Sequence, residues 1–133
     1  NSLGISIRRG DYLMLQDNHC VLDMEYYQTA LNKYFSFDNI DKIFIFSDDI
    51  DWCKDVFSNQ ENIIYSDSKT HFEDMCLMSM CDHNIIANSS FSWWSAWLNS
   101  NPNKKIIAPK IWFGTGLSHL NTDDVIPENW IKI

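Results

Sequence analysis

Short apolar runs alternate with helical patterns along most of the chain, and this alternation constrains the fold more than any other feature. Five runs read as strands: residues 3–7, 42–46, 62–65, 84–87 and 105–108. Four helical patterns lie between them: residues 24–34, 49–57, 71–81 and 91–99. Strands that alternate with helices in this way form a parallel sheet, because each crossover helix returns the chain to the same edge. The sequence therefore predicts an α/β fold.

Right-handed crossovers would make this a Rossmann-like sheet of about five strands with helices on both faces. The 133 residues suit one domain, and no linker or repeat divides them. The chain opens with Asn1 and runs directly into an apolar segment, so we expect no signal peptide and read residues 1–133 as a piece of a longer protein.

The net charge of −8 and the pI of about 4.7 argue against nucleic acid as a partner. No apolar run approaches the roughly 18–20 residues that span a bilayer. The four cysteines have no C-x-x-C spacing, which favours buried thiols in a reducing compartment over a zinc site. We therefore expect a cytoplasmic protein that is at most peripheral at a membrane.

Ligands of such sheets bind beyond the carboxyl ends of the strands, and polar residues gather there in this sequence. The only two arginines, Arg8 and Arg9, follow the first strand. Guanidinium groups fit phosphate oxygens with two parallel hydrogen bonds, and Gly10 would let the backbone come close to a diphosphate. Asp11 could hold one guanidinium in place. An ordinary surface ion pair remains the alternative.

A second polar run, Asn88-Ser89-Ser90-Phe91-Ser92, follows the fourth predicted strand at the start of a helix. Backbone N–H groups and the helix dipole attract phosphate at such a position, and serine hydroxyls add donors. A simple serine N-cap would explain one of these residues but not the whole run. The run is therefore a candidate phosphate site opposite the arginine pair.

Three aspartates are further candidates. Asp48 and Asp49 follow the second strand and could chelate Mg²⁺ or Mn²⁺, but we favour Asp49 as the N-cap of the next helix and predict no metal site. Asp74 lies among apolar residues of the helix predicted over 71–81. We assign the inner face of this helix to Phe72, Met75, Cys81 and either Leu77 or Met78. Asp74 either accepts the N–H donors of a guanine edge or belongs to a solvated helix face.

The aromatic cluster Phe91, Trp93, Trp94 and Trp97 favours a hydrophobic core over a carbohydrate platform. Neither G-x-G-x-x-G nor G-x-x-x-x-G-K-[ST] occurs, which disfavours a dinucleotide dehydrogenase and a P-loop NTPase. A nucleoside diphosphate bound without those loops points toward sugar-nucleotide transferases.

These segments together resemble the α-1,2-fucosyltransferases of glycosyltransferase family 11. The resemblance is carried by residues 6–12 (Ser-Ile-Arg-Arg-Gly-Asp-Tyr), 46–49 (Phe-Ser-Asp-Asp), and 88–94 (Asn-Ser-Ser-Phe-Ser-Trp-Trp), and it extends to 105–109 and 127–130. It covers nearly the whole chain in order. The family's motif has His where this chain has Ser6, a residue that can donate a hydrogen bond but cannot carry charge.

The resemblance implies the carboxyl-terminal, donor-binding half of a GT-B glycosyltransferase that transfers fucose from GDP-β-L-fucose with inversion and without a cofactor or metal. The acceptor would be a galactose-containing glycan. Arg8 would contact the β-phosphate, and Arg8 and Asp11 would be the catalytic residues that help GDP to leave. Arg9 would have a supporting role beside Arg8. Asp74 would bind guanine, and Ser6, Asn88, Ser89, Ser90 and Phe91 would complete the donor site. A non-catalytic nucleotide-sugar-binding module and a transferase of another sugar nucleotide remain open.

Overall fold

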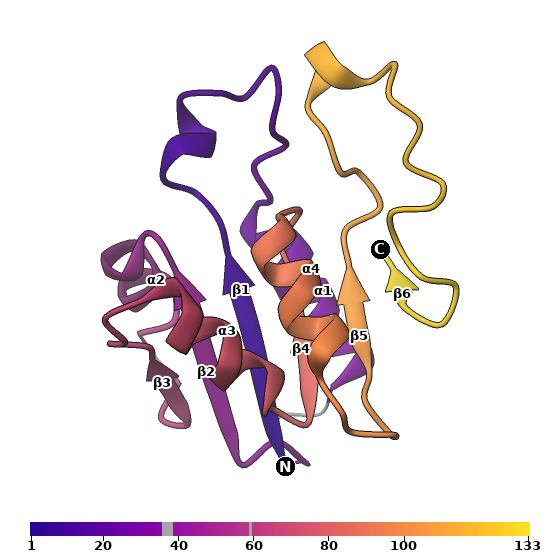
Figure 1. The fold of residues 1–133 in the computed structure, drawn as a ribbon. Helices are drawn as coiled ribbons and strands as arrows, with labels where there is room; N and C mark the ends of the chain where they lie inside the picture. Colours follow the sequence, from indigo (N-terminus) through magenta and orange to yellow (C-terminus); the bar gives the residue numbers. More distant parts are fainter. Residues whose placement is uncertain (36–38, 59) are drawn as a thin grey trace.

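The computed structural model describes residues 1–35, 39–58 and 60–133. All of its sheet strands run parallel in one six-stranded sheet with the order β3-β2-β1-β4-β5-β6 (Figure 1). The strands are β1 (Ser2–Ile7), β2 (Lys42–Ser47), β3 (Ile63–Tyr65), β4 (His83–Ile85), β5 (Ile106–Ala108) and β6 (Ile131–Lys132). The five predicted strands and the Rossmann-like arrangement are confirmed. The sixth strand was not predicted, because two residues carry no periodic signal.

The helices are α1 (Met24–Tyr34), α2 (Ile50–Val56), α3 (His71–Ser79) and α4 (Ser90–Leu98), with short 3-10 turns η1 (Asp11–Leu13) and η3 (Thr115–Leu117). Aspartate side chains start α1 and α2: Asp23 accepts from the Tyr26 N–H at 3.1 Å and Asp49 from the Trp52 N–H at 3.3 Å. Such caps satisfy backbone donors that the first turn leaves unpaired. The predicted capping role of Asp49 is confirmed.

Two apolar layers hold the helices to the sheet. One face of the sheet packs against α1 and α2, where Tyr27 and Cys53 are fully buried. The other face packs against α3 and α4 through Met78 and Ala96, and these two helices lie in front of the sheet in Figure 1. Helices on both faces bury the central strands, which explains the almost continuous apolar sequence of β2.

The aromatic side chains of α4 correct the prediction of a tryptophan core. Trp94 is 50% exposed and Trp97 is 51% exposed. The helix instead packs on the sheet through small residues, since Ser92, Ser95 and Ala96 are fully buried. Small side chains let the helix approach closely, and Trp94 and Trp97 are turned toward solvent, whereas Phe91 and Trp93 pack against the core as predicted.

The predicted inner face of α3 is also partly wrong. Phe72 is 73% exposed and Leu77 is 49% exposed, whereas Met78 and Cys81 are buried as predicted. The helix contacts both α4 and the sheet, so its buried side follows Met78 and excludes Phe72. Periodicity alone cannot fix which neighbouring stripe of an apolar helix faces inward.

Candidate functional site

A cleft of about 500 Å³ lies at the carboxyl ends of β1 and β2, between the segment that follows β1 and the starts of α3 and α4. The long segments that follow β1 and β5 extend beyond this end of the sheet (Figure 1). Of the sequence-predicted site residues, those that line the cleft are Ser6, Arg8, Asp11, Asp74, Ser89, Ser90 and Phe91. Arg9 and Asn88 are not among the lining residues. The lining residues that were not predicted as site residues are Ile7, Tyr12, His19, Phe46, Ser47, Asp48 and His71.

Arg8 lies at the end of β1 and is held between two carboxylates. Its Nη2 donates to Asp11 Oδ1 at 2.8 Å, and its Nε lies 3.2 Å from Asp48 Oδ2. The guanidinium also sits over the Tyr12 ring, 5.4 Å from its centroid. Two anchors fix the orientation of the planar group, and Nη1 has no partner within the described residues.

Asp48 ties the turn after β1 to the end of β2. Its Oδ1 accepts the Arg9 N–H at 2.9 Å, while Oδ2 pairs with Arg8. A Cβ added to Gly10 would lie 2.6 Å from Asp48 Oδ2, closer than any ordinary contact. A side chain at position 10 would therefore force the Asp48 carboxylate out of its place between Arg8 and the Arg9 N–H.

Gly10→Ala is expected to displace Asp48 and to destabilise the fold by about 1–3 kcal/mol, the usual cost of overpacking. Urea unfolding of the parent and the variant measures this difference. The same substitution in an Asp48→Ala background should cost far less, since the obstructing carboxylate is gone. An undiminished cost in that background would contradict the assignment.

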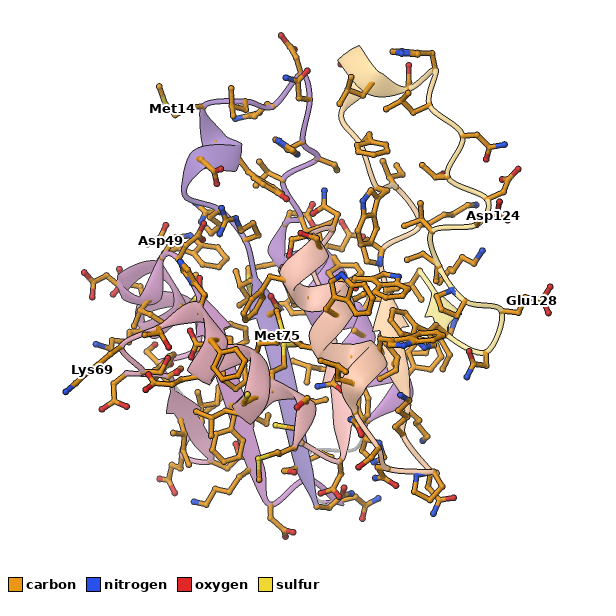
Figure 2. The ribbon with its side chains drawn as sticks, in the orientation of Figure 1. Met14, Asp49, Lys69, Met75, Asp124 and Glu128 are labelled. Carbon is orange, nitrogen blue, oxygen red and sulfur yellow. The ribbon has the colours of Figure 1, made fainter. Side chains whose placement is uncertain are left out.

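The adjacent Arg9 points away from the cleft. Its guanidinium stacks on Trp52 with 3.9 Å to the ring centroid, and its Nε lies 3.4 Å from Asp49 Oδ2. Asp49 is labelled in Figure 2 close to the point where the segment after β1 begins. Arg9 thus connects the turn after β1 to the start of α2, whereas Arg8 lies in the cleft.

The start of α4 faces the cleft with a chain of hydroxyls. Ser89 caps the helix by accepting the Ser92 N–H at 3.2 Å. The Ser92 hydroxyl lies 2.7 Å from the Ser89 hydroxyl and 2.6 Å from that of Ser6. Ser6, the residue at the family's His position, is therefore bonded to the helix start. The nine-residue helix α4 directs its free N–H groups toward the cleft beside Ser90.

Asn88 is buried beneath this turn. Its amide nitrogen donates to the carbonyls of Cys20 at 2.9 Å and Trp112 at 2.8 Å, so it joins the two long segments above the sheet. The Tyr12 hydroxyl donates to the Asn88 carbonyl at 3.0 Å. Burial raises the pKa of Tyr12 above its usual value, which keeps the phenol protonated and able to donate.

The opposite wall of the cleft comes from α3. Asp74 accepts hydrogen bonds from the hydroxyls of Ser66 and Ser68, and His71 meets the Phe91 ring edge-on at 6.4 Å. The other cleft histidine, His19, stacks on Tyr12 with 4.2 Å between ring centroids. Only the folding of residues 8–22 back over the sheet brings His19 here, and no local pattern marks it.

Among the described residues, no group of three or more His, Cys, Asp and Glu side chains is arranged to hold a metal ion. No helix in the described ranges is long and apolar enough to cross a bilayer.

The sequence matches the family model described as glycosyl transferase family 11 over residues 1–133. The chain belongs to this family. Two Escherichia coli relatives are each 39% identical across the whole chain. One is the O-antigen biosynthesis glycosyltransferase WbnK, of which the match covers 45%, and the other is an alpha-1,2-colitosyltransferase, of which it covers 48%. The chain thus spans about half the length of these relatives.

More distant relatives agree with this assignment. The human galactoside alpha-(1,2)-fucosyltransferase 1 is 25% identical over 103 residues, which cover 72% of this chain and 28% of the human protein. Among solved structures, the NodZ alpha-1,6-fucosyltransferase co-crystallised with GDP matches with a TM-score of 0.50 and 16% identity, over 74% of this chain and 35% of NodZ. At that identity the likeness supports the fold alone.

Proposed function

We propose that the cleft binds GDP-β-L-fucose and that the chain is the donor-binding half of a GT-B fucosyltransferase. The longer protein would transfer fucose with inversion to a galactoside hydroxyl in an α-1,2 linkage. The observation that carries this proposal is the convergence of Arg8, the start of α4 and Asp74 on one cleft. These three groups supply a guanidinium, free backbone donors and a carboxylate, which are the groups that a guanosine diphosphate needs.

The diphosphate would lie between Arg8 and the start of α4. Nη1 of Arg8 is available to a phosphate oxygen, while Asp11 and Asp48 keep the guanidinium in position. Ser89 and Ser90 add hydroxyl donors beside the helix start. As the bond to fucose breaks, negative charge grows on the β-phosphate, and a fixed cation there stabilises the leaving GDP.

Asp11 would act through Arg8. It is the more exposed of the two carboxylates, with a side chain that is 55% exposed against 19% for Asp48. Asp11 would thus hold the Nη2 side of the guanidinium at the more open edge of the cleft, while Nη1 reaches the phosphate. Asp48 would remain in place and hold the Nε side of the guanidinium.

The base would lie against α3, where Asp74 lines the cleft. Guanine presents N1–H and N2–H₂ donors on one edge, and a carboxylate accepts such donors. Adenine has an acceptor at N1 and would meet the carboxylate with a lone pair. The site therefore favours GDP over ADP.

A donor panel tests the proposal. Thermal shift of the purified chain should increase with GDP and GDP-fucose, and much less with UDP and ADP sugars at equal concentration. A larger shift with UDP sugars would overturn the base assignment. No shift with any of them would overturn the proposed donor site.

Colitosyl transfer is the second candidate, because one 39% identical relative carries that activity in its name. Competing GDP-fucose and GDP-colitose in an assay of the longer enzyme separates the two.

Divalent metal is expected to be dispensable for donor binding. Asp48 and Asp49, the pair that could chelate an ion, are instead engaged by Arg8, Arg9 and the start of α2. The GDP dissociation constant should therefore agree within about twofold in excess EDTA and in Mg²⁺, a difference below about 0.5 kcal/mol. Calorimetry in both buffers measures this. Binding that disappears in EDTA and returns with Mn²⁺ or Mg²⁺ would make the two aspartates the leading ligands.

A further inference from the structure

The carboxylate of Asp74 is held by two serines of the loop between β3 and α3. The hydroxyls of Ser66 and Ser68 both donate to the same oxygen, Oδ1. Within the described part of the chain, Oδ2 accepts no hydrogen bond. An ionised carboxylate offers about four acceptor positions, so two hydroxyls on Oδ1 leave the positions on Oδ2 free.

This loop is itself fixed at both ends. The Ser66 N–H donates to the Ile45 carbonyl at 2.9 Å and so extends the pairing of β3 with β2. At the other end, Thr70 and Glu73 form a capping box at the start of α3, and the Lys69 N–H donates to Glu73 at 2.9 Å. Hydroxyls presented by such a loop restrict the rotation of the Asp74 side chain.

The serines approach Asp74 from outside the donor cleft. Ser66 lines a neighbouring hollow of about 490 Å³, whereas Asp74 lines the donor cleft, and neither serine is among the cleft residues. Ser66 therefore reaches Asp74 from the neighbouring hollow, and Ser68 bonds the same oxygen without lining the cleft.

We infer that Ser66 and Ser68 are positioning residues that set the selectivity of the cleft for guanine. They hold Oδ1 from behind and present Oδ2 to the N–H donors of the base. This inference rests on the proposed function, since it requires Asp74 to contact guanine. The selectivity for guanine over adenine would then depend on two side chains that do not touch the nucleotide.

The reason is preorganisation. A carboxylate that rotates freely must be ordered when the base binds, and the conformational entropy that the side chain then loses weakens binding. Ordering it beforehand with two hydroxyls favours guanine, whose donors reach the carboxylate. It gives ADP no advantage, because adenine presents an acceptor at N1 and no N1–H for the carboxylate to accept.

The test is calorimetric titration of the chain with GDP and with ADP. The double variant Ser66→Ala/Ser68→Ala should bind GDP about five- to tenfold more weakly, while ADP affinity should not fall. Ser66→Thr/Ser68→Thr keeps both hydroxyls and should recover most of the selectivity. Ser79→Ala is the matched control, because that hydroxyl donates to the Cys76 carbonyl within α3, away from the cleft.

Equal weakening of GDP and ADP would show a merely structural role and overturn the inference, as would an unchanged ratio of the two affinities. In an Asp74→Ala background the serine substitutions should cause no further loss of GDP affinity.

A parent chain that fails to distinguish GDP from ADP would instead overturn the base assignment itself. If the double variant does not fold, Ser68→Ala alone should lower the ratio, and an unchanged ratio there contradicts the inference.

Discussion

Arg8→Lys is expected to weaken GDP binding at least about tenfold, which corresponds to about 1.4 kcal/mol. Lysine keeps the charge but cannot hold Asp11 and Asp48 while it reaches a phosphate oxygen. The guanidinium does so because its donors are spread over a rigid plane. Calorimetry on the parent and the variant measures the loss, and turnover of the longer enzyme should fall by at least a similar factor.

Arg9→Lys is the matched comparison, because the adjacent guanidinium lies on Trp52 and Asp49 outside the cleft. Its effect on GDP affinity should be clearly smaller than that of Arg8→Lys. Near-parental affinity in Arg8→Lys, or a larger loss in Arg9→Lys, would remove Arg8 from the diphosphate site.

Asp74→Ala is expected to abolish most of the preference of the cleft for guanine. The parent should bind GDP at least about tenfold more tightly than ADP, because a carboxylate left facing a lone pair costs about 1–3 kcal/mol or more. Without the carboxylate, GDP should bind more weakly and ADP should no longer be penalised, so the two affinities should converge while the shared contacts to the diphosphate remain. Paired titrations of both nucleotides into parent and variant measure this.

Asp67→Ala provides the control for this substitution. Asp67 is a nearby carboxylate that lines the neighbouring hollow and not the donor cleft, so its removal should leave the GDP-to-ADP ratio intact. An unchanged GDP affinity in Asp74→Ala would mean that Asp74 serves the fold alone, and the guanine assignment would fail.

Local pattern was sufficient to predict the sheet, but not how every helix packs on it. Continuous apolar runs such as β2 can only be strands covered on both faces, so the parallel fold followed from the sequence. The packing of α4 did not, because Ser92 and Ser95 are fully buried while Trp94 and Trp97 are half exposed. From hydrophobicity alone, the tryptophans would be buried and the serines exposed. The observed burial is the reverse, because only small side chains let the helix lie close to the sheet.

The cleft was predictable where its residues directly follow strands or begin helices, as Arg8 and Ser90 do. The sequence marked Asp48 as a possible metal ligand but did not reveal its arginine partners. These lie at the end of another strand, with a separation of 39 residues between Arg9 and Asp48 along the chain. His19 reaches the cleft because residues 8–22 fold back, held by contacts such as the Gly114 N–H to the Asn18 carbonyl at 2.9 Å. Such long-range contacts leave no local pattern.

Guanosine diphosphate is expected to bind in this cleft and in no other hollow of the described residues. An NMR titration of the isotope-labelled chain with GDP tests this expectation most directly, because each backbone amide reports its own surroundings. The amides of Ser89, Ser90 and Phe91 at the start of α4, with His71 and Asp74 on α3, should shift in a saturable way. Shifts that concentrate instead around Leu77 and Met80 in the neighbouring hollow, or no saturable shift at all, would contradict the account.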